Sequence, residues 1–226
     1  MSGSRYGRGM RGVPGTLAPR DPTSPDMAPV DLALVFAVDS SGSISNERQA
    51  AQIEGHATAI TSPDFIAAIA NLPTGRAALA YVAWSNHNRQ QYMVPWRVIT
   101  DQPSADAWAE TLRTATRPGA GFTSLSGAID FCAHALLHIA PPAARRVIDL
   151  IADGRNNDGR PVMSARDDAV AAGITINGLP VLDLDPHLDD YFSQEVVGGP
   201  ACFVLPANDS PGLIRAIRRK LLSEIA

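Results

Sequence analysis

The sequence predicts an α/β domain with a doubly wound, mainly parallel sheet of about six strands and helices on both faces. From Asp31 onward, short apolar runs alternate with amphipathic stretches, which is the order of strands joined by crossover helices. Two runs, residues 32–38 (LALVFAV) and 146–152 (RVIDLIA), are almost wholly apolar, as is typical of strands that a parallel sheet buries on both faces. The link at residues 85–91 is too short for a crossover helix, so one edge pair should be antiparallel.

The individual elements follow from the period of the apolar residues. Apolar runs of strand length predict strands at residues 32–38, 76–84, 91–99, 146–152, 174–181 and 201–205. Stretches with apolar residues at helical spacing predict helices from residue 43 or 45 to about 60, and at 101–115, 124–139, 161–172, 187–197 and 210–225. The chain is therefore expected to start with a strand, and a helix should connect most of the successive strands.

Capping and breaking residues mark the predicted helix ends. Ser43 or Ser45 can cap the first helix, because a serine hydroxyl accepts a hydrogen bond from a backbone N–H of the first turn. Gly173 is the usual left-handed stop for the helix before it. Ser210 caps the last helix and Pro211 opens it, since proline tolerates the first helical position.

The first 30 residues differ from the rest in composition. They hold five Gly and five Pro, so residues 1–30 are expected to be a disordered tail and residues 31–226 a single domain. A GxGxxG sequence at residues 7–12 has neither a strand before it nor a helix after it, so we interpret it as a chance match to the dinucleotide fingerprint. The tail also lacks the apolar segment of a secretory signal, which predicts a cytoplasmic location for the chain as given.

Charge and cysteine content exclude several other classes. The net charge is −4 and no basic cluster runs through the domain, which excludes nucleic acid as a leading partner. No apolar run approaches the roughly 20 residues that cross a bilayer. Cys132 and Cys202 match no zinc pattern, and either can be a plain core residue; a disulfide between them stays open for an exported chain. The oligomeric state is not predicted.

Carboxylates and hydroxyls gather where predicted strands end. Asp39, Ser41 and Ser43 follow the first strand, and Asp153 follows the fourth. A glycine-rich loop delivers Thr123 to the start of the helix at 124–139. Because ligands of such sheets bind beyond the carboxyl ends of the strands, we expect these five side chains at one edge. An all-oxygen set with at most two charges suits a hard divalent cation, Mg²⁺ first, with Mn²⁺ or Ca²⁺ as alternatives.

These segments resemble those of von Willebrand factor type A (vWA) domains. DSSGS after an apolar strand is similar to their DxSxS signature, and FTSLSGAID and LIADG are similar to the Thr and Asp segments of their metal-ion-dependent adhesion site (MIDAS). The resemblance covers residues 31–226 and implies a Rossmann-like vWA fold. It also implies that the ligands are Asp39, Ser41, Ser43, Thr123 and Asp153.

A closer resemblance is to an uncharacterised bacterial subgroup of vWA-like proteins, a domain-of-unknown-function group. It depends on the stretches YVAWS, VPWRVI, RRVIDLIADGRNNDGRP and AAGITINGLPV. Members of that group commonly carry an export signal. The resemblance therefore makes a periplasmic or secreted location the alternative to a cytoplasmic one, if the true start of the chain differs.

The function that these residues predict is protein binding without catalysis. An Asp or Glu of a partner protein or peptide would complete the coordination of the cation. The rim of the site, which would select that partner, is expected to comprise Ser40, Phe122, Arg155, Asn156, Asn157 and Asp158. Residues 154–159 can equally be an ordinary turn-rich connector.

Two other functions compete with this hypothesis. A metal-assisted hydrolase or phosphatase would use the same cation, but it needs a general base, and Asp158 is the one nearby candidate. A metal-free structural scaffold would keep the fold alone. His134 and His138 are four residues apart, a spacing that metal ligands on a helix can have. The helix is expected to bury the face that carries Leu125, Ile129, Cys132 and Leu136, which leaves both histidines on a solvated outer face.

Overall fold

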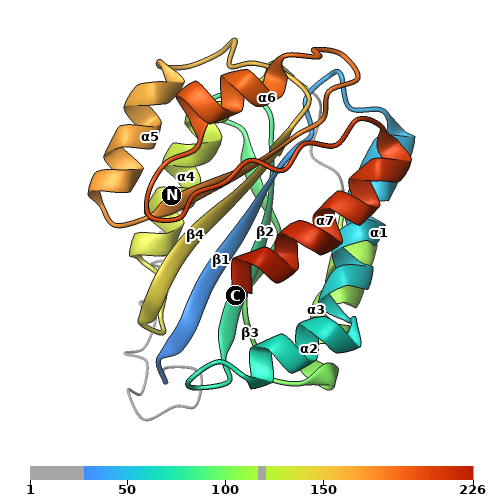
Figure 1. The fold of residues 1–226 in the computed structure, drawn as a ribbon, viewed down its shortest axis with the longest axis vertical. Helices are drawn as coiled ribbons and strands as arrows, with labels where there is room; N and C mark the ends of the chain where they lie inside the picture. Colours follow the sequence, from blue (N-terminus) through green and yellow to red (C-terminus); the bar gives the residue numbers. More distant parts are fainter. Residues whose placement is uncertain (1–27, 117–120, 226) are drawn as a thin grey trace, which may run out of the picture.

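The structure, a computed structural model, describes residues 28–116 and 121–225. Within those ranges it holds a five-stranded sheet of order β3-β2-β1-β4-β5 (Figure 1). The strands are β1 (Val30–Asp39), β2 (Ala77–Trp84), β3 (Gln90–Ile99), β4 (Ala143–Ala152) and β5 (Thr175–Pro180). β2 and β3 pair antiparallel and the other three pairs are parallel, which confirms the predicted mixed sheet with its antiparallel edge.

Helices cover both faces of this sheet (Figure 1). One face packs against α1 (Asn46–Ile60), α2 (Pro63–Ala70), α3 (Gln102–Thr114) and α7 (Ser210–Ile225). The other packs against α4 (Leu125–Leu137), α5 (Val162–Ala171) and α6 (Leu188–Tyr191), which continues as a π-helical turn at Phe192–Val196. The doubly wound α/β fold is therefore confirmed.

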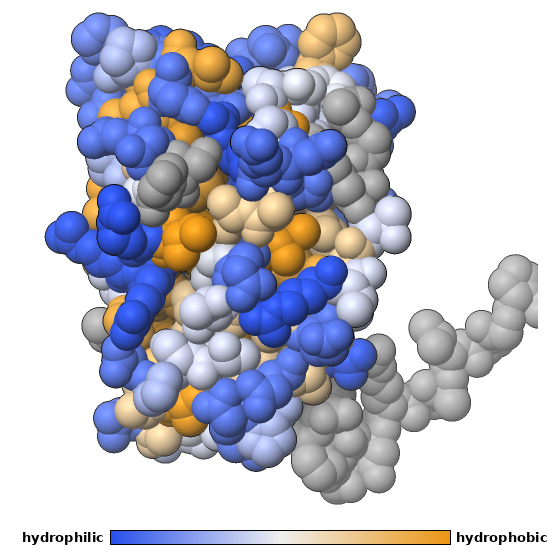
Figure 2. All heavy atoms as spheres, turned by 90° about the vertical axis from the view of Figure 1, so that its right-hand side faces the viewer, coloured by the Kyte–Doolittle hydropathy of each residue, from blue (hydrophilic) through white to orange (hydrophobic). Residues whose placement is uncertain are grey.

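The central strand shows why the fold forms. Leu34 and Phe36 of β1 lie in the core under α1 and α7, whereas Val35 and Ala37 lie in the core under α4 and α5. Because alternate side chains of a strand point to opposite faces, an unbroken apolar run serves both cores at once. The outer surface of the α1–α3–α7 layer is mainly hydrophilic (Figure 2).

Two predictions about the elements are wrong. Residues 201–205 form no strand: they meet β5 at single bridges such as Gly178–Val204, because the chain turns at Gly199 and Ala201, both with positive φ. The helix α2 was not predicted, although Ser62 caps it and Pro63 opens it. Phe65 and Ile69, four residues apart, bury its inner face.

Several predictions fall outside the described residues. One is the disorder expected for the tail, of which only residues 28–30 are described, and Val30 among them already belongs to β1. Another is the GxGxxG stretch at residues 7–12. The side chains of Ser210 and Pro211, expected to begin the last helix, also lie outside. The boundaries of the tail and the domain stay a prediction.

The remaining structural expectations can be compared directly. Cys132 is buried and Cys202 partly exposed, and both are free thiols, so the alternative of a disulfide does not occur in this structure. His134 and His138 are exposed on α4, as expected. Among the described residues, no helix combines the length and apolar character needed to cross a membrane.

A buried charged cluster lies between the sheet and α7, and the sequence pattern did not predict it. The Lys220 ammonium is fully buried, 2.5 Å from Asp149 Oδ1 and 2.7 Å from Glu224 Oε1. Asn177 Nδ2 donates to Glu224 Oε2 at 2.6 Å. The Lys220 charge thus lies close to both buried carboxylates and offsets their charge, although Asp149 Oδ1 accepts no well-oriented hydrogen bond in the described residues.

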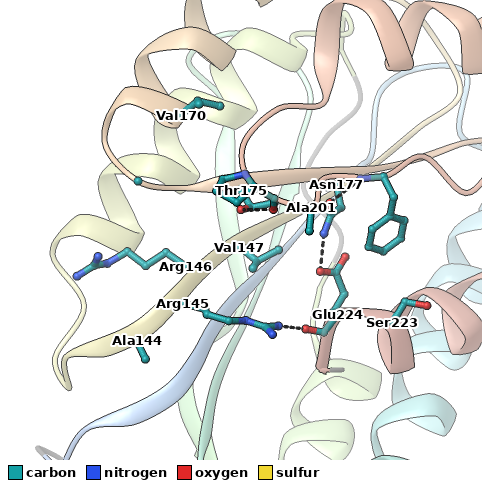
Figure 3. Close-up of a pocket in the computed structure, with 13 residues that line it drawn as sticks. Ala144, Arg145, Arg146, Val147, Val170, Thr175, Asn177, Ala201, Ser223 and Glu224 are labelled. Atoms are coloured by element: carbon teal, nitrogen blue, oxygen red, sulfur yellow. Dashed lines mark hydrogen bonds between the residues drawn. The ribbon is translucent and has the colours of Figure 1, made fainter.

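A cavity of about 630 Å³ adjoins this cluster at the amino end of β4, away from Asp153. Asn177 and Glu224 form part of its wall, together with Arg145 and Arg146. Figure 3 shows the two arginines pointing to opposite sides of β4, with Arg145 donating to the backbone carbonyl of Glu224. The two cationic side chains therefore do not converge on one point.

Candidate metal site at the carboxyl edge of the sheet

Three loops meet beyond the carboxyl ends of β1 and β4. The Gly42 N–H donates to the carbonyl of Gly121 at 2.9 Å, which joins the loop after β1 to the loop before α4. Thr123 N–H donates to Asn157 Oδ1 and Asn157 N–H donates to Thr123 O, both at 2.9 Å. Ser43 Oγ donates to Asp153 Oδ1 at 2.7 Å. Backbone and side-chain bonds thus hold the predicted segments together.

Asp39 is a buried carboxylate that the protein satisfies only in part. Its Oδ1 accepts a hydrogen bond from Ser41 N–H at 2.7 Å. Its Oδ2 is buried without a hydrogen-bond partner in the described residues. Burial raises the pKa of this carboxyl to about 7; hydrogen bonds from Ser41 and from the Asp153 backbone oppose that rise, and the charge of Asp153 adds to it. A cation beside Oδ2 would offset this unfavourable environment, so the site fits one.

Three hydroxyl side chains lie at the same edge of the sheet. The Oγ atoms of Ser41 and Ser43 lie 3.2 Å apart. Thr123 is buried, and its side chain lies against Gly154, where an added methyl would stand 3.7 Å from Thr123 Oγ1. The structure therefore brings all five predicted residues to one edge. In the described ranges, no group of three or more His, Cys, Asp or Glu side chains could hold a metal ion, so hydroxyls would have to complete this donor set.

Arg48 is part of the site and was not predicted. It lies in the first turn of α1, which Ser45 caps, and its Nη1 donates to Asp153 Oδ2 at 2.5 Å. Its Nη2 pairs with Asp183 Oδ2. Both oxygens of Asp153 are thereby engaged, one by Ser43 and one by Arg48. No local pattern could have signalled this pairing, because 105 positions separate Arg48 from Asp153.

The loop between β2 and β3 holds the loop before α4 in place, and the sequence analysis did not predict this contact. Ser124 N–H donates to the Ser85 carbonyl at 2.9 Å, and Phe122 N–H donates to Asn86 Oδ1 at 3.1 Å. A methyl at Gly121 would stand 1.7 Å from Asn86 Oδ1, so a larger residue there would displace the Asn86 side chain from its hydrogen bond with Phe122 N–H. Ser85 directly follows a buried strand, and the rule used for Asp39 and Asp153 could have found it.

Three of the six predicted rim residues are exposed at this edge: Asn157, whose contacts are given below, Phe122 and Arg155. Phe122 is 64% exposed, which is unusual for a large apolar side chain. Arg155 pairs with Asp185 at 2.8 Å, and its guanidinium lies 5.0 Å from the centre of the Tyr191 ring. Both side chains could contact a bound partner.

The other rim residues hold the loop in place. Asn156 Oδ1 accepts from Ser126 N–H at 3.0 Å, and Asn157 bonds Thr123 as described. Asp158 Oδ2 accepts from His87 N–H at 2.7 Å, which lowers the pKa of that carboxyl. Residues 154–159 are therefore a fixed connector as well as part of the rim.

Ser40 was placed on the rim wrongly. Its side chain is 2% exposed, and its Oγ donates to the Trp84 carbonyl at 2.9 Å. It alternates with Asp39 and Ser41 along an extended segment, so its side chain turns toward β2 instead of the loops.

Comparisons with known proteins agree with this fold. The model of the family described as "Protein of unknown function (DUF1194)" matches residues 29–226. No curated protein sequence matches the chain. Among solved structures, proximal thread matrix protein 1 from the mussel byssus superposes with a TM-score of 0.65 at 12% identity, over 86% of this chain and 47% of that one.

Other solved structures point the same way. The same mussel protein with a zinc-occupied MIDAS motif gives a TM-score of 0.63 at 14% identity, over 86% of this chain and 48% of that one. The pilus adhesin SpaC from Lactobacillus rhamnosus GG gives 0.64 at 14%, over 87% and 30%. The von Willebrand factor type A protein from Catenulispora acidiphila gives 0.58 at 16%, over 87% and 43%. The chain spans half or less of these relatives, and the similarity confirms the vWA fold.

Proposed function

The chain belongs to the family described as "Protein of unknown function (DUF1194)", and we propose that this member binds a partner protein through a divalent cation. The cation, Mg²⁺ by preference, would be held by Asp39, Ser41, Ser43, Thr123 and Asp153. An Asp or Glu side chain of the partner would complete its coordination. Mn²⁺ and Ca²⁺ are the alternative ions.

The observation that carries this proposal is the unsatisfied Oδ2 of buried Asp39. A buried carboxylate oxygen without a partner is costly, and the hydroxyls of Ser41, Ser43 and Thr123 lie at the same edge of the sheet. Carboxylate and hydroxyl oxygens are the ligands of hard divalent cations. The zinc-occupied MIDAS of the mussel protein supports metal binding at this edge of the same fold.

Each residue of the proposed cation site would have its own role. Asp39 supplies negative charge, while Ser41, Ser43 and Thr123 supply neutral oxygens. When bound, the cation supplies a positive charge and an open coordination position for a partner carboxylate. Because most of the donors are neutral, much of that charge remains available to the partner. Exposed Phe122, next to Thr123, offers an apolar contact beside the ion.

Calorimetric titration of the chelator-treated, dialysed protein tests the cation site. Mg²⁺, Mn²⁺ and Ca²⁺ are titrated into the wild type, Asp39→Asn and the control Asp130→Asn. Asp130 is an exposed carboxylate on α4 that pairs with Arg160. We expect saturable binding of one ion by the wild type and the control, and none by Asp39→Asn. A folded wild type that gives no saturable heat with any of the three ions contradicts the proposal.

A capture experiment tests the partner. The immobilised chain is incubated with an extract of its native source, with Mg²⁺ or with excess EDTA. Proteins bound through the cation should be lost with EDTA and should return when Mg²⁺ is restored. Capture that survives complete chelation counts against recognition through the ion.

We also propose that the module has no catalytic activity. Asp158, the candidate general base, is bonded by His87 N–H and Nδ1, and the lowered pKa of its carboxyl makes it a weaker base. Turnover of a generic phosphoester by the wild type that disappears in Asp39→Asn would favour the hydrolase alternative instead.

A further inference from the structure

The strongest unexplained feature of the site is a buried guanidinium among its carboxylates. Arg48 carries a full charge that proteins do not remove by deprotonation, and its side chain is only 11% exposed. Asp153, which it contacts at 2.5 Å, has a fully buried side chain. Charges so placed interact strongly, because little water screens them.

This contact leaves Asp153 little to offer a cation. Its Oδ1 accepts from Ser43 and its Oδ2 accepts from Arg48, so each oxygen has one lone pair left, and an ion that used it would stand close to one of these donors. The guanidinium also neutralises the charge of Asp153. An entering dication would therefore meet a site in which Arg48 cancels one carboxylate charge, and it would also meet the repulsion of Arg48 itself.

Asp183 holds Arg48 in this position from the other side. It lies in the loop after β5, and its carboxylate pairs with Nη2 while Nη1 contacts Asp153. The remaining guanidinium nitrogen, Nε, is buried without a hydrogen-bond partner in the described residues. Two carboxylates on two different loops therefore hold the Arg48 side chain, whereas a simple surface ion pair would involve only one.

We infer that Arg48 is a built-in counter-charge that weakens cation binding at this site, and that Asp183 keeps it there. This inference depends on the proposed cation site. Its consequence is that the ion would be held loosely by the chain alone and tightly only once a partner carboxylate adds a negative charge. Cation and acidic partner would then bind cooperatively, each raising the affinity of the other.

The opposite role makes the opposite prediction. If Arg48 only positioned Asp153 for the ion, removing it would weaken cation binding. If Arg48 is a counter-charge, Arg48→Gln should bind Mg²⁺ and Mn²⁺ at least tenfold more tightly than the wild type, because one repelling charge is gone and Asp153 is released. Arg48→Lys, which keeps the charge, should stay within about threefold of the wild type, since hydrogen-bond geometry alone changes.

The experiment is calorimetric titration of Mg²⁺ and Mn²⁺ into the full chain, with circular dichroism to verify folding. Arg113→Gln is the matched control, because Arg113 pairs with Glu54 of α1 at a distant, exposed position. Arg48→Met, which also removes the charge, provides a second variant should Arg48→Gln fail to fold, and it should likewise bind the ions more tightly. Asp183→Asn, at a partly exposed position, leaves Arg48 to Asp153 alone and should bind the ions several-fold more weakly.

The possible results separate this inference from the proposed function. Tighter binding by Arg48→Gln, or by Arg48→Met, supports it. A wild type that binds, together with an Arg48→Gln that binds equally or more weakly, overturns the role of Arg48 and leaves the cation site intact. If neither the wild type nor folded Arg48→Gln gives saturable binding heat, the cation site is overturned, and the inference with it.

Discussion

Replacing Lys220 with methionine should destabilise the protein more than any surface change. The substitution keeps an unbranched side chain, one atom shorter, but removes a fully buried charge that faces Asp149 and Glu224. Removing one partner of a buried ion pair typically costs about 3–5 kcal/mol, because the remaining charge stays buried and uncompensated. For a chain of this length the loss corresponds to a fall in Tm of roughly 6–20 °C.

The cost should depend on pH in a defined direction. Burial raises the pKa of both Asp149 and Glu224, while the Lys220 charge opposes that rise. Without Lys220, protonation is the remaining way to neutralise these carboxyls. A carboxyl whose pKa is raised by folding contributes stability at low pH, and that stability is lost as the pH rises through the folded-state pKa. The deficit of Lys220→Met should therefore be smaller at pH 5 than at pH 8.

Thermal and urea unfolding, followed by circular dichroism in EDTA, measures this effect without interference from cations. The matched control is Arg218→Ala on the same helix, since Arg218 and Asp64 form an exposed pair at 2.6 Å. The control should cost less than about 1 kcal/mol. If Lys220→Met costs no more than the control at pH 8, the cluster contributes little to stability and the reasoning is refuted.

Two further predictions concern Thr123 and His56. Thr123→Ala should reduce the affinity for Mg²⁺ measured by calorimetry. It should change the free energy of unfolding by less than about 1 kcal/mol, because it removes a hydroxyl at the sheet edge without opening a core cavity. A large fall in Tm with unchanged affinity would mark Thr123 as structural. Burial lowers the pKa of His56 to about 4 from 6.5, so the stability from its neutral ring is complete above pH 6.5 and is lost as the pH falls through about 4, a difference of about 3 kcal/mol. His56→Phe should flatten the fall in urea-unfolding free energy between pH 6.5 and 4.5, and a wild-type curve already flat over that range would contradict the assignment.

The order of strands and helices was mostly predictable because it depends on local periodicity. The continuous apolar run of β1 is typical of a strand that both faces of a parallel sheet bury. The prediction failed at residues 201–205, where a short apolar run lies beside β5 but pairs with it only at the single bridge Gly178–Val204. It also missed α2, whose signals are two local residues, Ser62 and Pro63, and one short apolar face.

The candidate site was predictable to the same extent. Asp39, Ser41 and Ser43 lie within one turn, and the topology of a parallel sheet brings Asp153 and Thr123 to the same edge. Exposure was less predictable: Ser40 differs from its neighbours only in the side of the extended backbone on which its side chain lies, and that side faces Trp84.

By itself, the sequence determined the strand order along the chain, the two-faced core and the oxygen-rich edge, because each depends on residue type and short spacing. Only the tertiary structure decided which buried charges meet. Arg48 reaches Asp153 and Asp183, and Lys220 reaches Asp149, because α1 and α7 pack against β4 with those positions turned inward. Helical periodicity alone would place a charged residue on the outer face, so pairs of this kind follow from how the layers dock and not from any pattern along the chain.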